Sequence, residues 1–161
     1  MNSPETEFTV LVIGYGNALR GDDGVGREVA RRLEERALPD GINVLSVHQL
    51  LPELAEPISR AARVIFIDAD AELPAGEFRS RAVSPSKPVH AAIGHHQTPG
   101  EILRLAHDLY GYAPPATLWS VGGENFGYQD RLSPIVHRAL PGLIQELLHA
   151  IGAPCEPLST H

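Results

Sequence analysis

The sequence predicts an α/β fold: a three-layer sandwich with a central, mostly parallel, twisted sheet of about five strands and helices on both faces. Short apolar segments rich in β-branched residues alternate along the chain with amphipathic segments of helical spacing. Two of the apolar segments, residues 8–14 and 64–68, are hydrophobic at nearly every position, which is typical of strands buried on both faces. No internal repeat or interdomain linker divides the 161 residues, so we expect a single domain over residues 1–161.

Five segments are predicted to be strands. The three most apolar are residues 8–14 (FTVLVIG), 42–48 (INVLSVH) and 64–68 (VIFID). Residues 77–83 alternate in polarity and suit an edge strand, and residues 118–121 form the last strand. The globular core should cover residues 8–151, with frayed ends at residues 1–7 and 152–161.

Four segments are predicted to be helices. They cover residues 23–36, about 52–61, the stretch from Thr98 and Pro99 to Gly111, and a final stretch from Ser133 and Pro134 in which Pro141 predicts a kink. Thr98 is a good cap and Pro99 suits the first helical position, because its missing N–H is not needed there. Gly111 suits the end of that helix.

Composition excludes several functions. The formal net charge is −7 and the basic residues are scattered, which argues against nucleic-acid and membrane-surface partners. The only cysteine is Cys155, so neither a disulfide framework nor a cysteine metal cage can form. No signal peptide and no membrane-spanning stretch is recognisable, so we expect a cytoplasmic protein, and its size and acidity suit a monomer.

A glycine-rich loop, residues 14–26 (GYGNALRGDDGVG), follows the first predicted strand. Its opening Gly-x-Gly suits a dinucleotide-binding loop, but Leu19 stands where that fingerprint needs a third glycine. The second predicted strand ends near His48 rather than in an acid, and Asp22 and Asp23 would repel a pyrophosphate. A nucleotide-dependent oxidoreductase therefore remains only a minor alternative.

Aspartates stand at a predicted helix start and at a predicted strand end. One of Asp22 and Asp23 can cap the helix, so we interpret Asp22 as structural and Asp23 as functional. Asp68 closes an apolar strand, where a carboxylate is costly unless it is solvated, paired or ligating. The competing interpretation of Asp68 is a turn residue that bonds its own backbone.

His95 and His96 directly precede a predicted helix, whose dipole favours the neutral imidazole that binds metals. Neighbours on an extended segment point in opposite directions, so one of the two should enter a site, and the alternative is a solvated loop histidine. Because ligands bind at the carboxyl ends of parallel strands, Asp23, Asp68 and one histidine should meet there. Two carboxylates and one imidazole suit nickel, zinc or manganese.

With these residues the sequence resembles the hydrogenase maturation endopeptidases. The likeness consists of the loop of residues 14–26 after a strand, Asp68 at a strand end, and His96-Gln97 ahead of a helix, and it extends over residues 9–151. His95 departs from the family pattern by adding a second imidazole. Residues 122–125 (GGEN) depart from it by replacing the more usual turn.

The resemblance implies an endopeptidase that removes the C-terminal extension from the nickel-loaded large-subunit precursor of a nickel-iron hydrogenase. It also implies that Asp23, Asp68 and His96 contact nickel carried by that substrate, as a signal of readiness and as a Lewis acid on the scissile carbonyl. The alternative is a nickel-sensing or chaperone-like module that docks the same subunit without cutting it.

Overall fold

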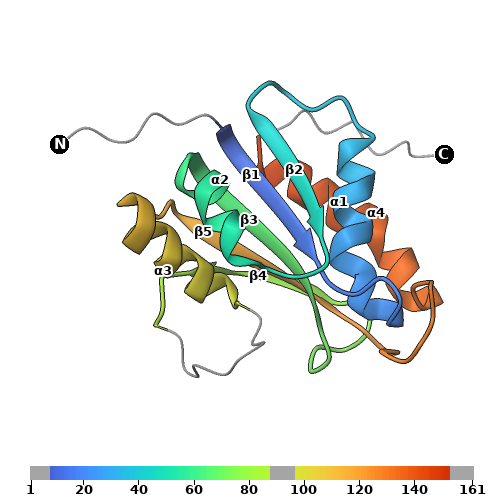
Figure 1. The fold of residues 1–161 in the computed structure, drawn as a ribbon. Helices are drawn as coiled ribbons and strands as arrows, with labels where there is room; N and C mark the ends of the chain where they lie inside the picture. The colour runs from blue at the N-terminus through green and yellow to red at the C-terminus, as the bar shows by residue number, and fades with distance from the viewer. Residues whose placement is uncertain (1–7, 88–96, 153–161) are drawn as a thin grey trace.

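A computed structural model describes residues 8–87 and 97–152, which form one five-stranded sheet flanked by helices (Figure 1). The strand order is β2-β1-β3-β5-β4. The strands are β1 (Phe8–Tyr15), β2 (Ile42–Val47), β3 (Ala61–Asp70), β4 (Phe78–Val83) and β5 (Ala116–Gly122). Strand β4 is antiparallel to β5 and all other pairs are parallel, which confirms both the mostly parallel sheet and the edge position of β4.

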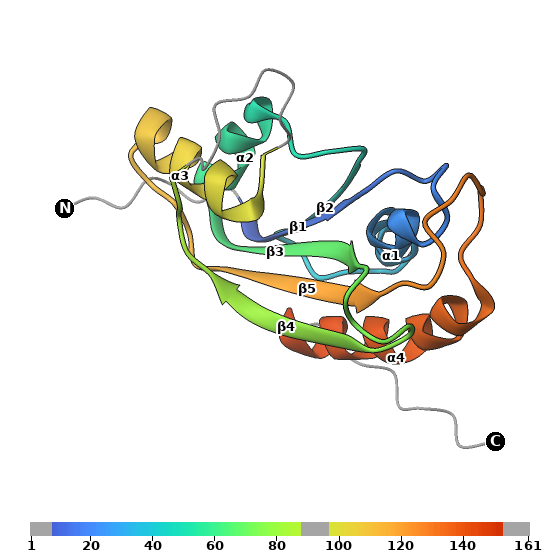
Figure 2. The same cartoon turned by 90° about the horizontal axis from the view of Figure 1, so that it is seen from below.

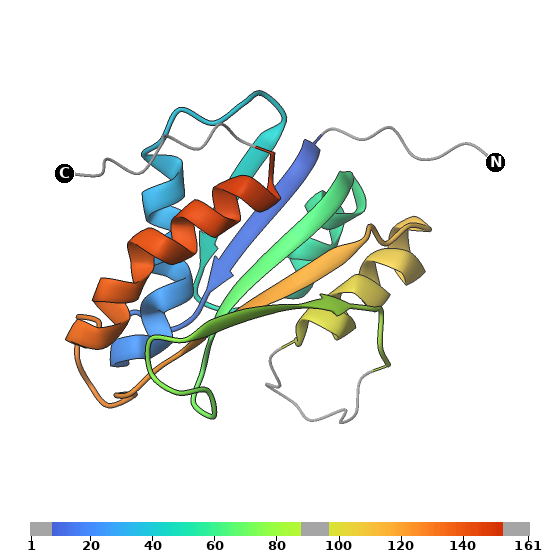
Figure 3. The ribbon, with the colours of Figure 1, turned by 180° about the vertical axis from the view of Figure 1, so that it is seen from behind.

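Helices cover both faces of this sheet, as Figures 2 and 3 show from two sides. The helices are α1 (Val25–Glu34), α2 (Ala55–Ser59), α3 (Pro99–Tyr110) and α4 (Pro134–Ala150), and two short 3-10 helices, η1 (Gly21–Gly24) and η2 (Pro52–Leu54), precede α1 and α2. Helices α1 and α4 lie on one face, and α2 and α3 lie on the other. The predicted three-layer architecture is therefore confirmed. Among the described residues, no helix is both long and apolar enough to cross a membrane.

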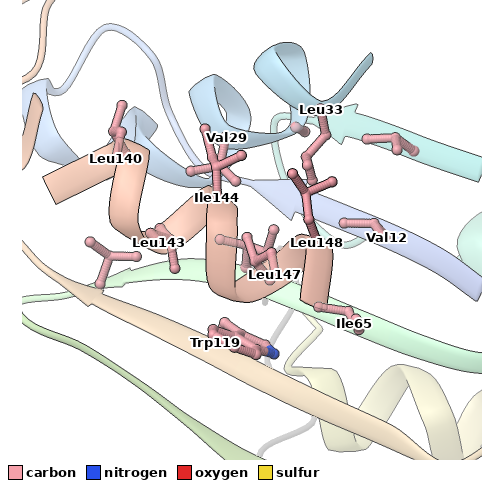
Figure 4. Close-up of a cluster of buried hydrophobic side chains, with 14 of the residues drawn as sticks. Val12, Val29, Leu33, Ile65, Trp119, Leu140, Leu143, Ile144, Leu147 and Leu148 are labelled. Carbon is pink, nitrogen blue, oxygen red and sulfur yellow. The ribbon is translucent and has the colours of Figure 1, made fainter. Parts of the chain in front are cut away.

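Two apolar cores separate the layers. The first lies between the sheet, α1 and α4, where the buried face of α4 packs on Trp119 and on the first helix (Figure 4). The second lies between the sheet, α2 and α3. Strands β1 and β3 contribute to both cores, because successive side chains point to opposite faces. This explains why both segments are apolar at nearly every position.

Helix ends follow the predicted chemistry at α3 and depart from it elsewhere. Thr98 caps α3 by accepting a hydrogen bond from the Glu101 N–H at 3.2 Å, and Gly111 ends it with φ 78°. The helix predicted from residue 23 begins two residues later, at Val25, because residues 21–24 form η1. Neither Asp22 nor Asp23 caps α1, so the capping interpretation was wrong.

Three further predictions need correction. Strand β3 continues to Asp70, so Asp68 lies inside the strand and does not close it. Ser133 occupies the N-cap position of α4 without a side-chain cap hydrogen bond, and α4 runs through Pro141 without interruption. Since Asp68 remains close to the carboxyl end of β3, its expected position at that edge of the sheet still holds.

The first turn of α1 packs closely against the carboxyl ends of β1 and β3. A Cβ atom added at Gly26 would lie 2.3 Å from the Ile67 carbonyl oxygen and 2.7 Å from that of Tyr15. A Cβ atom at Gly14 would lie 2.0 Å from the Gly26 oxygen. These contacts leave no room for a side chain, so close packing accounts for the glycines at positions 14 and 26.

We expect Gly26→Ala to lower the free energy of unfolding by about 1–3 kcal/mol, because the added methyl group must displace backbone atoms. The matched control is Gly142→Ala in α4, where an added Cβ meets nothing within 4 Å. That change should stabilise the protein by about 0.5–1 kcal/mol, the usual gain in a helix interior. Urea unfolding measures both. Equal stabilities of the two variants would contradict this account of the packing.

Candidate functional site

The structure brings two of the three predicted site residues together at the carboxyl ends of β1 and β3. Tyr15 lies one step beyond the Gly14–Ile67 register pair, beside Asp68. The Tyr15 hydroxyl donates a hydrogen bond to the Asp68 carboxylate. The negative charge of Asp23, on the loop that follows β1, acts on both side chains. The site is therefore a pair of carboxylates with a phenol beside them.

A tight loop fixes the position of Asp23. The Asn17 N–H donates a hydrogen bond of 2.8 Å to Asp23 Oδ2. Gly16 has φ 145°, and a Cβ atom there would lie 1.9 Å from the Asp23 carbonyl oxygen. Only glycine allows the chain to close this tightly over Asp23. The half-buried carboxylate is thereby held at the mouth of the site.

Asp68 is a partly buried carboxyl group with an unusual proton affinity. Burial raises the pKa of its carboxyl group from 3.8 to about 6. Hydrogen bonds from the Ala69 N–H, at 2.8 Å, and from the Tyr15 hydroxyl oppose that rise, whereas the charges of Asp23 and Asp70 add to it. The bond to Ala69 shows that the competing interpretation, a residue bonding its own backbone, is correct in part. It does not account for Tyr15 or for the nearby Asp23.

Sequence reasoning missed Tyr15. Burial raises the pKa of its phenol, and the charge of Asp68 and the hydrogen bond to it raise that pKa further. The phenol therefore stays protonated and acts as a donor to Asp68. Its position directly after a buried strand, between two glycines of the loop, was the available signal.

Asp22 faces away from this site and has no solvent exposure. Its carboxylate accepts hydrogen bonds from the N–H groups of Glu124, Asn125 and Ser133 at 2.8, 3.0 and 2.7 Å, and from the Ser133 hydroxyl at 2.8 Å. Burial would raise the pKa of this carboxyl group, but these hydrogen bonds together hold it below its usual value. The structural interpretation of Asp22 is confirmed, with loop binding in place of helix capping.

The unusual residues 122–125 are part of this arrangement. They continue from β5 into the loop whose amides bind Asp22, and the Asp22 N–H donates in turn to the Asn125 carbonyl oxygen at 2.8 Å. A Cβ atom at Gly123 would lie 2.9 Å from the Asp22 Cβ. The departure from the expected turn therefore provides the partner for Asp22.

His96 and His95 lie outside the described residues. Within residues 8–87 and 97–152, no group of three or more histidine, cysteine or acidic side chains lies close enough together to hold a metal. The complete ligand set of Asp23, Asp68 and His96 therefore stays a prediction. Two carboxylates held side by side can bind a divalent cation, and a third ligand from a neighbouring loop would leave positions open for a substrate.

A cavity of about 710 Å³ lies elsewhere, along the outer side of α1. Arginine and glutamate side chains of α1 and residues 130–132 line it, but Asp23 and Asp68 do not. Its charges are mixed, and two of its lining residues, Arg31 and Glu28, form an ion pair with each other. We therefore place the chemistry at the strand ends rather than in this cavity.

Comparison with known proteins supports the resemblance that the sequence predicts. A protein of Methanocaldococcus jannaschii, provisionally named a hydrogenase maturation protease, is 38% identical over 68 residues, or 39% of this chain and 44% of the relative. The match thus spans less than half of the relative's length. No model of a known protein family matches the chain.

Solved structures show the same fold. The hydrogenase maturating endopeptidase HybD of Escherichia coli aligns with a TM-score of 0.73 and 24% identity, over 90% of this chain and 93% of that one. HybD of Thermococcus kodakarensis, a nickel-iron hydrogenase maturation protease, aligns with a TM-score of 0.67 and 22% identity, over 89% and 99% of the two chains. These similarities confirm the predicted fold class.

We expect Asp22→Asn to destabilise the protein by about 2–4 kcal/mol at neutral pH, because an amide cannot replace a buried carboxylate that accepts four hydrogen bonds. Asp130→Asn, an exposed change in the same loop, is the control and should be neutral within about 0.5 kcal/mol. Thermal and urea unfolding compare the two. An Asp22→Asn variant as stable as the control would show that the loop is held by other contacts.

Asp68→Asn should have the opposite effect. The raised pKa means that folding favours the protonated carboxyl group, so the stability that it contributes is lost as the pH rises from about 4 to about 6. Asparagine carries no charge at any pH, so we expect it to stabilise the protein by about 1–3 kcal/mol at pH 7.5 and to have little effect near pH 4. Unfolding measured at both pH values tests this. A loss of stability at pH 7.5 would contradict it.

Proposed function

We propose that this protein is an endopeptidase that removes the C-terminal extension from the nickel-loaded precursor of a nickel-iron hydrogenase large subunit. The observation that carries this proposal is the pairing of Asp23 with Asp68 at the carboxyl ends of β1 and β3, on a fold shared with the HybD endopeptidases. The similarity to the provisionally named protease of Methanocaldococcus jannaschii supports the same activity.

In this proposal the nickel arrives as part of the substrate. Asp23 and Asp68 supply oxygen ligands, and His96 supplies a neutral imidazole from the segment before α3. Nickel held by the precursor supplies Lewis acidity toward the scissile carbonyl. The chain's own part is to hold two carboxylates at fixed positions, Asp23 through the Asn17 amide and Asp68 through Tyr15.

The charges of Asp23 and Asp68 suit a site that distinguishes a nickel-loaded precursor from an empty one. Without a cation, burial and, to a smaller extent, the charge of Asp23 disfavour the charged form of Asp68, and its pKa rises to about 6. A divalent cation between the two carboxylates reverses that preference, because it attracts both and displaces the proton. A precursor without nickel would instead meet a site with unbalanced negative charge, which gives a physical reason for selecting the loaded substrate.

Asp23→Asn should lower the rate of precursor cleavage by about 10²–10⁴-fold, because the amide is a poorer ligand and carries no charge. The fold should be preserved, since Asp23 is half-buried and an amide oxygen can still accept the hydrogen bond from the Asn17 N–H. Asp40→Asn, an exposed change, is the control. Mass spectrometry of the nickel-loaded precursor after incubation with each protein measures release of the C-terminal peptide.

Release of the peptide by the wild type and by Asp40→Asn, but not by Asp23→Asn, would support both the activity and the site. Full activity of Asp23→Asn would refute the site. A precursor that binds the wild-type protein and stays intact would refute the peptidase, and would favour the nickel-sensing or chaperone-like alternative, which uses the same residues.

A further inference from the structure

Strand β4 presents a free edge close to the candidate site. It is the last strand of the order β2-β1-β3-β5-β4 and pairs with β5 alone among the described residues. Figure 3 shows it, in light green, along the border of the sheet. Residues 79–82 are all exposed. The backbone N–H and C=O groups on the outer side of such a strand can accept one more strand.

Arg79 and Arg81 point from this edge toward the face that carries the site. Asp68 is in register with Ser120, and Ser120 is in register with Arg79, so the three side chains lie on one face of the sheet. Arg81, two residues further along β4, shares that face and is in register with Leu118. Two strand spacings of about 4.8 Å separate β4 from β3.

The two arginines form an unbalanced positive pair on an acidic protein. Neither has an ion-pair partner in the part of the chain that the structure describes. Four of the ten other arginines pair with carboxylates one helical turn away: Arg31, Arg32, Arg60 and Arg104. The charge of Arg81 also acts on Tyr15, so it reaches toward the site. Two like charges on one strand face repel each other, and carboxylates of a ligand would relieve that repulsion.

We propose that β4 binds the C-terminal extension of the substrate as an added strand, with Arg79 and Arg81 pairing with acidic side chains two residues apart in that segment. This inference rests on the proposed function. Alternate residues of an added strand face the same side, as Arg79 and Arg81 do on β4. Backbone hydrogen bonds to β4 give affinity for any extended chain, and the two guanidinium groups select acidic ones.

The geometry also sets the distance from the bond that is cut. A strand added outside β4 lies three spacings, or about 14 Å, from the backbone of β3 that carries Asp68. An extended chain spans that distance in about four or five residues. The acidic pair of the extension should therefore lie roughly four to six residues from the scissile bond.

The first test needs no cleavage. The ¹⁵N-labelled protein is titrated with the extended peptide acetyl-Thr-Glu-Val-Glu-Thr-Val-amide, and amide chemical shifts are followed. We expect saturable shifts along residues 78–83, at least about fivefold weaker binding when both glutamates are lysine, and similar weakening in Arg79→Glu/Arg81→Glu. The conservative Arg79→Lys/Arg81→Lys variant should keep most of the affinity. Shifts confined to other strands, or affinity unaffected by charge reversal, would overturn the proposal.

The second test uses the precursor. We expect the reversed pair to raise KM for the nickel-loaded precursor at least about fivefold and to leave kcat within about twofold, because β4 holds the substrate away from the reacting bond. Arg36→Glu/Arg138→Glu carries the same change in net charge at exposed positions outside the sheet and should behave as wild type. Unchanged KM in the reversed pair would show that these arginines only protect the edge from aggregation.

These tests separate two kinds of failure. If the wild type cleaves the precursor, and if replacing Arg79 and Arg81 changes neither KM nor peptide binding, the proposed activity stands and the proposed β4 surface is wrong. If the peptide binds β4 and neither the wild type nor any variant cleaves the precursor, the proposed activity is wrong, and β4 is still a surface that binds acidic extended peptides.

Discussion

The buried carboxylate of Asp22 is the contact on which the site depends. It joins the loop after β1 to the loop after β5 and to the start of α4, through hydrogen bonds from Glu124, Asn125 and Ser133. The position of the next residue, Asp23, is fixed by that anchor and by the hydrogen bond from the Asn17 amide. One acid of the pair is therefore fully satisfied inside the protein, and its neighbour is left available to a ligand.

Two carboxylates near the carboxyl ends of the strands, Asp22 outside the candidate site and Asp68 inside it, thus have opposite environments. Four hydrogen bonds stabilise the charged form of Asp22, whereas burial and the charge of Asp23 disfavour the charged form of Asp68. A stable carboxylate such as Asp22 suits a structural role, whereas a destabilised one such as Asp68 suits a group that binds a cation. The glycines around them, such as Gly26, allow α1 to approach β1 and β3 closely enough to assemble both environments.

The sequence predicted most of the fold because its signals were local. Buried strands were visible as apolar runs, and α3 was marked by Thr98, Pro99 and Gly111. The start of α1 was misplaced because residues 21–24 form a 3-10 turn in which Asp22 binds a distant loop, which no local rule can anticipate. Asp23 and Asp68 were recognised from strand ends and from a resemblance. Tyr15 was not, because its role depends on lying beside Asp68 of the neighbouring strand β3, just past the last register pair of the two strands.

The central claim is that Asp23 and Asp68, with His96, bind nickel that the substrate already carries. Nickel X-ray absorption spectra of the loaded precursor, alone and in its complex with this protein, test that claim most directly. The account predicts additional oxygen and nitrogen ligands at nickel in the complex, and their loss when Asp23 is replaced by asparagine. A nickel environment that stays unchanged in a fully formed complex would contradict it.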